Sequence, residues 1–135
     1  MMRVFVDANV FLRYFTRDEA GQHERADRLF REASRGAVDL VAGPPILFEI
    51  AWTLQAAYKT PREKVLDVLS RISAFPGLEL TDSLLVERAL QLARSGDRDF
   101  ADAYIAASAE AAGAAAVATL NIKDFQRLGA VTYKF

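Results

Sequence analysis

Short apolar runs alternate with amphipathic segments along most of the chain. The runs predict strands over residues 3–6, 39–42, 115–119 and 131–134. Between them, apolar residues recur three and four positions apart, which predicts helices over residues 24–34, 44–58, 61–75, 83–94 and 99–112. Strands that alternate with helices in this way predict an α/β protein with a mainly parallel central sheet and helices on both faces.

Length and composition favour an ordered globular protein. The chain has 135 residues, of which 52% are hydrophobic and 26% are charged, so we expect one domain over residues 1–135. A net charge of -1 provides no general attraction to nucleic acid, so any such binding needs a local basic patch. No segment resembles a membrane span or a signal peptide, and cysteine is absent, so we expect a cytoplasmic protein without membrane association.

Acidic residues interrupt the apolar sequence at several points. Asp7 directly follows the first predicted strand, and Glu49 lies in the apolar helix after the second. The other polar residues of interest lie at the start of the last long helix or after the third predicted strand: Asp99, Asp102, Asn121 and Asp124. Because ligands bind at the carboxyl ends of strands in parallel sheets, we expect most of these residues at one rim.

The helix that contains Glu49 is apolar on nearly every side, which is typical of a buried helix. Helical geometry directs Glu49 away from the main core stripe and toward Thr53 and Ala56; that stripe consists of Leu47, Ile50, Ala51 and Leu54. Trp52, in the same helix, and Tyr104 are interpreted as core residues rather than as platforms for stacking bases.

Carboxylates gathered at one rim repel one another, and a divalent cation relieves that repulsion. Mg²⁺ prefers carboxylate and water oxygens and suits phosphate substrates. Cysteine is absent and His23 is the only histidine, which argues against a zinc site or a histidine-based triad. Structural roles stay open for four of the acids. Asp7 fits a turn or helix cap and Asp99 a helix cap. Glu49 fits a partly exposed helix residue or a partner for an arginine, and Asp124 fits a solvated acid in a polar loop.

Four stretches of the chain together resemble the PIN domain, in particular the VapC-type toxins of type II toxin–antitoxin systems. The stretches are VFVDANVFL at 4–12, Glu49 with AWTL at 51–54, DFADAYIAA at 99–107, and ATLNIKDF at 118–125. The resemblance spans nearly the whole chain. It implies a three-layer α/β/α fold, Mg²⁺-dependent cleavage of RNA, a cognate antitoxin and frequent homodimerisation.

The resemblance also assigns roles to individual residues. Asp7, Glu49 and Asp102 match the metal-binding acids of the family, with Mn²⁺ as a possible substitute for Mg²⁺, and imply metal-assisted phosphodiester hydrolysis. Asn121 stands where many PIN domains carry an acid two residues after the threonine, and Asp124 is the alternative source of that charge.

Further residues are expected to support these acids or to contact RNA. Asn9 and Thr119 would orient the metal ligands, and Asp99 would extend the acidic pocket. Contacts with RNA phosphates are expected from three basic residues, Arg13, Lys123 and Arg127.

Two alternatives from other functional classes remain open. An aspartate after a buried strand is also typical of phosphatases that form an aspartyl-phosphate, but their usual second acid two residues later is Asn9 here. The other alternative is a catalytically inactive PIN-like binding module. Trapping of a phosphoenzyme would identify the first alternative, and a metal titration would identify the second.

Overall fold

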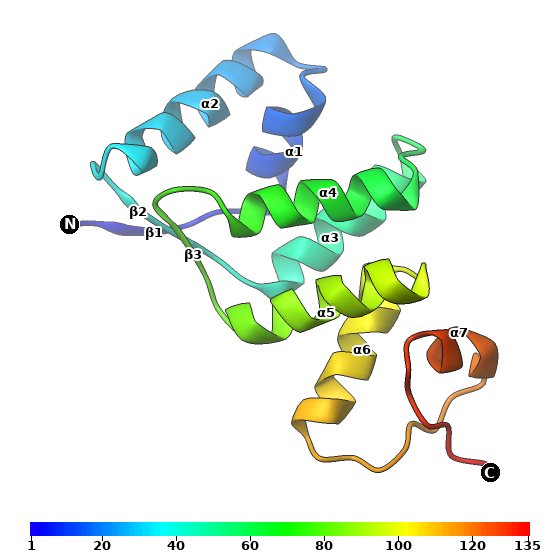
Figure 1. Ribbon diagram of the computed structural model, residues 1–135. Coiled ribbons are helices and arrows are strands. Elements are labelled where there is room, and N and C mark those ends of the chain that lie inside the picture. The colour runs from blue at the N-terminus through cyan, green and yellow to red at the C-terminus, as the bar shows by residue number, and fades with distance from the viewer.

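The computed structural model describes all residues, 1–135, and contains three strands and seven helices (Figure 1). In chain order the elements are β1 (Arg3–Phe5), α1 (Ala8–Thr16), α2 (Ala20–Ser34), β2 (Asp39–Ala42), α3 (Pro44–Ala56), α4 (Arg62–Ser73), β3 (Leu78–Leu80), α5 (Ser83–Gly96), α6 (Phe100–Ala111) and α7 (Ile122–Arg127).

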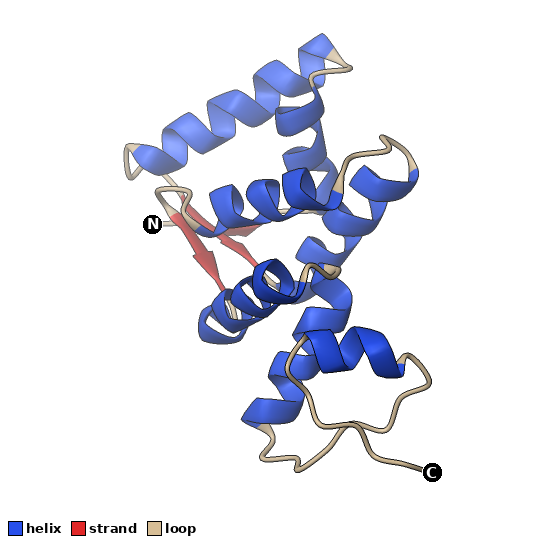
Figure 2. Ribbon diagram, turned by 45° about the vertical axis from the view of Figure 1, so that its right-hand side comes forward, coloured by secondary structure: helices blue, strands red, loops and turns tan.

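The strands form one parallel sheet in the order β1-β2-β3. Val4 pairs with Leu40, and Val41 pairs with Glu79. Parallel neighbours require crossover connections, which α1 and α2 provide between β1 and β2, and α3 and α4 provide between β2 and β3. Helices α2 and α5 lie on opposite sides of the strands in both ribbon views (Figures 1 and 2). The predicted α/β/α architecture with a parallel sheet is confirmed.

One cluster of 27 buried hydrophobic residues joins the sheet to the helices around it. In α3 the predicted stripe is confirmed in large part, since Leu47, Ile50 and Leu54 are buried. Glu49 is exposed on the opposite side, as expected. The prediction for Trp52 is wrong, because its side chain is 69% exposed.

Several element boundaries differ from the predictions, and three short elements were not predicted. Helix α2 begins four residues earlier than expected and α3 ends two residues earlier. Strand β3 and helix α7 are too short to show a clear periodicity, and α1 follows Asp7 within an unbroken apolar run. No helix combines the length and the apolar character needed to cross a lipid bilayer.

The two predicted C-terminal strands are not part of the sheet. Residues 115–119 and 131–134 are reduced to a single parallel bridge between Val117 and Thr132. Two backbone hydrogen bonds hold it, from the Val117 N–H to the Val131 carbonyl and from the Tyr133 N–H to the Val117 carbonyl, both 2.8 Å long. The physical reason is composition: three of the five residues at 115–119 are alanines, which favour strands weakly and bury little apolar surface.

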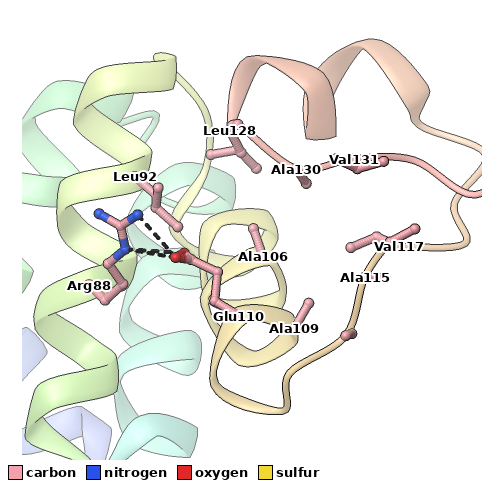
Figure 3. A pocket seen from close by; sticks show the side chains of 13 residues that line it. Arg88, Leu92, Ala106, Ala109, Glu110, Ala115, Val117, Leu128, Ala130 and Val131 are labelled. Atoms are coloured by element: carbon pink, nitrogen blue, oxygen red, sulfur yellow. Dashed lines mark hydrogen bonds and ion pairs between the residues drawn. The ribbon is translucent and has the colours of Figure 1, made fainter.

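The C-terminal segment instead extends away from the sheet beside α6 (Figure 1). A cavity of about 270 Å³ lies between this segment and helices α5 and α6 (Figure 3). Its walls are mostly small apolar side chains, and Arg88 forms an ion pair of 3.1 Å with Glu110 at its edge. None of the predicted site residues lines this cavity.

Gly77 provides a test of how the turn before β3 is built. Its φ is +79°, and a Cβ atom there would collide with the carbonyl oxygen of Ala33 at the end of α2. We expect Gly77→Ala to lower the free energy of unfolding by about 2–4 kcal/mol, from left-handed strain together with overpacking. Urea denaturation of both proteins measures the difference.

Gly113→Ala is the matched control for the backbone effect. Gly113 also has a positive φ, +70°, but no atom lies within 4 Å of the position that a Cβ would take. Its substitution should cost only the conformational strain, about 1–2 kcal/mol. Equal losses for the two variants would contradict the steric role of Gly77.

Candidate active site

Asp7 lies at the carboxyl end of β1, as predicted. The pairing of β1 with β2 continues as far as Val6, whose N–H donates to the Val41 carbonyl at 2.9 Å. The Asp7 backbone is extended and its side chain caps α1, accepting a hydrogen bond of 2.8 Å from the Ala8 N–H. The carboxylate is exposed and has no cationic partner, so the capping role leaves it accessible to a ligand.

Glu49 lies on the exposed face of α3, the helix that follows β2. It makes no side-chain hydrogen bond and no ion pair. Thr53 on the same side is half-buried and Ala56 is exposed, which agrees with the direction predicted from helical geometry. The carboxylate of Glu49 is therefore also free to bind a cation.

Asp99 is held by two side chains from other helices. It is the N-terminal cap residue of α6 and accepts a hydrogen bond of 2.9 Å from Arg62 Nε and one of 3.2 Å from Gln55 Nε2. Arg62 also donates to the carbonyl of Asp97 at 2.7 Å. Since Arg62 begins α4 and Gln55 lies in α3, Asp99 joins three helices.

Asp102 has a carboxyl group whose pKa is shifted by its surroundings. Partial burial raises its pKa, and the nearby carboxylates of Asp99 and Asp124 raise it further. Arg62 and Arg98 act in the opposite direction, but with smaller effects. Asp102 therefore holds a proton more readily than an ordinary aspartate does.

Asp124 lies in α7 and pairs with Arg98, whose Nε is 2.7 Å from its Oδ1. The N–H of that nitrogen is not directed at the carboxylate, so the contact is an ion pair rather than a well-formed hydrogen bond. Asn121, the other candidate for the fourth acidic position, is exposed and precedes α7. Its N–H donates to the Thr119 hydroxyl at 3.0 Å, so Thr119 stabilises this turn.

The structure gathers only part of the predicted site. Asp99, Asp102 and Asp124 share one electrostatic environment, whereas no three acidic or histidine side chains are grouped closely enough to hold one metal ion. Arg62 and Arg98 also neutralise the two acids beside Asp102. In this arrangement the residues do not fit a bound Mg²⁺, and the metal-binding role of Asp7, Glu49 and Asp102 stays a prediction.

The predicted RNA-contacting residues lie on two separate helices. Arg13 and Asn9 line a cavity of about 190 Å³ between α1 and α2, where Arg13 Nε donates to Gln22 at 2.6 Å. Arg127 donates to the Gly96 carbonyl at 3.1 Å and so connects α7 to the end of α5. Lys123 is exposed and makes no ion pair.

Sequence reasoning missed the partners of the acids. Two of them, Gln55 and Arg62, contact Asp99 from distant parts of the sequence. Arg98 contacts Asp124 but lies within a run of mixed charges, so its partner is not evident from the sequence. The only local signal is the alternation of charge in Asp97-Arg98-Asp99 just before α6.

A protein-family model, the PIN domain, matches residues 4–131. The chain belongs to the PIN domain family. Comparisons with curated proteins and with solved structures find no match. PIN domains are generally nucleases and typically use divalent metal ions, so membership supports a nuclease-type function at the acids described above.

The raised pKa of Asp102 predicts a stabilising substitution in this PIN domain. Above the folded-state pKa the charged carboxylate destabilises the native state relative to the unfolded chain, where it is fully solvated. Asp102→Asn should therefore increase the free energy of unfolding at pH 7, by less than about 1 kcal/mol because solvent screens the charges. The gain should vanish near pH 3, below the unfolded pKa of about 3.8. Urea denaturation across this pH range measures it.

Asp27→Asn is the matched control. Asp27 forms an exposed i,i+4 ion pair of 3.0 Å with Arg31 in α2, so its loss should destabilise by about 0.3–0.5 kcal/mol at pH 7. A destabilised Asp102→Asn variant at pH 7 would contradict the electrostatic account of Asp102.

Proposed function

We propose that this PIN domain is an Mg²⁺-dependent endoribonuclease and the toxin of a type II toxin–antitoxin pair. Membership of the family over residues 4–131 carries the proposal. It is supported by Asp7, Glu49 and Asp102, which the resemblance of the sequence motifs equates with the acids of the family. The preference for RNA rests on the resemblance of the motifs at 4–12 and 99–107 to those of VapC-type toxins. We also propose a cytoplasmic homodimer.

The proposed reaction is hydrolysis of a phosphodiester, in which water adds across a P–O bond. As a metal ligand Asp102 would have to be ionised, and a cation beside it would oppose the effects that raise the pKa of its carboxyl group. His23 lies in α2, which carries none of the three acids that support the proposal; its ring stacks on Tyr14 and its Nδ1 lies 3.2 Å from the Arg13 carbonyl oxygen. Lys123 has a free ammonium group for a phosphate.

Mg²⁺, or Mn²⁺ in its place, is the proposed cofactor on the basis of family membership. Its proposed ligands, Asp7, Glu49 and Asp102, would have to approach one another more closely than they do in the structure. That separation also favours the alternative of an inactive PIN-like binding module, so a cleavage assay decides between the two.

We expect the purified protein to cleave structured RNA in Mg²⁺ or Mn²⁺ and to lose this activity in EDTA. Asp7→Asn should reduce the rate at least 100-fold while the protein remains folded, because asparagine also caps helices well. Gel analysis of a 5′-labelled RNA measures cleavage, and circular dichroism checks folding.

Asp67→Asn is the control for the cleavage assay, because Asp67 of α4 pairs with Arg94 of α5, outside the proposed site. It should cleave as the wild type does. Cleavage that persists unchanged in EDTA would reject the metal requirement. Absence of cleavage with every divalent ion tested would favour the binding module.

A partner protein is expected to bind the exposed acids. Asp7 and Glu49 have no cationic partner within the chain, so an arginine or lysine of an antitoxin would be attracted to them. Expression of this chain alone should arrest growth, and co-expression of the protein encoded beside it should restore growth and yield a co-purifying complex. Normal growth with the chain alone, and no complex, would count against the toxin assignment.

A further inference from the structure

Trp52 is a large aromatic side chain that the core does not use. It lies in the middle of α3 and is 69% exposed, although Ile50 and Leu54 on either side of it in sequence are buried. Exposure of a tryptophan sacrifices a large hydrophobic contribution to folding. Its ring is therefore a large apolar surface that is accessible to a ligand.

Trp52 lies beside two parts of the candidate active site. Glu49 is three residues earlier in α3, so both side chains project from the same exposed helix face. On its other side, Trp52 borders a cavity of about 170 Å³ that Asp99 also lines. A group bound in this cavity against the ring would thus lie beside Asp99, with Glu49 about one helical turn from Trp52 on α3.

The cavity has apolar walls and polar groups, as a site for a flat heterocycle requires. Phe48 and Phe100 line it, with ring centroids 5.4 Å apart, and Gln55 and Arg62 contribute the polar groups. Its volume is more than ten times the 10–15 Å³ or so that one water molecule needs. It is therefore suited to a group larger than a single water or ion.

Hydrogen-bonding groups remain free on both polar side chains. Because the carboxylate of Asp99 only accepts, Gln55 directs its amide nitrogen there, and its Oε1 has no protein donor. Arg62 uses Nε and Nη1 for Asp99 and Asp97, whereas its Nη2 donates to no protein group. One free acceptor and one free donor match the mixed edge of a nucleobase.

Local charge favours a base over a phosphate. Arg62 lies between two carboxylates, those of Asp97 and Asp99, at 3.4 and 2.9 Å. The three side chains together carry a negative formal charge, which repels a phosphate but not a neutral base. Stacking on an aromatic ring is also how proteins commonly hold unpaired RNA bases.

We propose that Trp52 and the adjoining cavity form a base-binding subsite, in which an unpaired RNA base stacks on the indole while Gln55 and Arg62 bind its edge. The inference rests on the proposed function for its ligand class. It assigns Trp52 a role in substrate positioning beside the cleavage site.

The single tryptophan makes the test direct. In EDTA, where cleavage is suppressed, an octamer of adenylate RNA should quench Trp52 fluorescence in a saturable way, whereas inorganic polyphosphate should not. Trp52→Ala should raise the Kd for the fluorescently labelled octamer about 5- to 100-fold, measured by anisotropy. Trp52→Phe keeps a stacking surface and should recover most of the affinity.

Tyr133→Ala is the matched control, because Tyr133 is an exposed aromatic residue, 61% accessible, outside the cavity. It should bind the octamer as the wild type does. The inference is overturned if Trp52→Ala binds the octamer as tightly as wild type, or if polyphosphate quenches equally. It is also overturned if Trp52 emission shifts with protein concentration alone, which would place the ring in an interface between copies.

The binding and cleavage assays separate this inference from the proposed function. Suppose that the octamer quenches the wild-type fluorescence and binds Trp52→Ala more weakly, but that the wild type cleaves RNA under no condition. This result would support the subsite and reject the nuclease. Cleavage by the wild type, together with unchanged octamer binding by Trp52→Ala, would support the nuclease and reject the subsite.

Discussion

Parallel pairing of the three strands is the constraint on which the position of the N-terminal acids depends. Because β1 and β2 are each followed by a crossover to a parallel strand, their carboxyl ends turn into helices at the same edge of the sheet, and β3 leads into α5 at that edge. Asp7 caps the helix after β1, and Gly43 precedes the helix after β2. Space rather than φ favours glycine at Gly43, since a Cβ atom there would collide with the hydroxyl of Thr81, the residue after β3, unless that side chain moved. The edge that presents Asp7 is therefore closely packed.

The acids of α6 are organised differently, by arginine rather than by the sheet. Arg62 connects Asp99 to the loop before α6, and Arg98 holds Asp124 of α7. These ion pairs reduce the repulsion within the acid group, so the fold does not need a metal ion to tolerate it. Asp102 is left without a partner of its own, which is why burial and its acidic neighbours raise its pKa.

Sequence pattern predicted the features that rest on local periodicity and the parallel sheet. The first two strands, five of the seven helices and the exposed direction of Glu49 follow from those rules. The two predicted C-terminal strands are instead reduced to one bridge, between Val117 and Thr132, because the alanines at 115–119 carry almost no preference for a strand. The contact between Arg62 and Asp99 links residues 37 apart in sequence, which no local rule predicts. The exposure of Trp52 could have been predicted, since Trp52 shares the helix face of Glu49. The prediction instead relied on its large apolar side chain, which is typical of a core residue.

The same core packing that stabilises the fold also fixes the spacing of the candidate functional groups. Phe48 of α3 packs against two aromatic rings of α6, with centroids 5.4 Å from Phe100 and 5.0 Å from Tyr104. Glu49 and Trp52 lie one and four residues after Phe48 on α3, while Asp99 and Asp102 lie one residue before and two residues after Phe100 at the start of α6. The interlocked aromatic rings oppose movement of one helix against the other, because displacement would open voids between them. Rotation of the Glu49 and Asp102 side chains, rather than movement of the helices, would therefore bring these two acids closer together. The distance from the proposed base subsite to the acids of α6 is thus set by apolar contacts, and the polar groups need only line the space that those contacts leave.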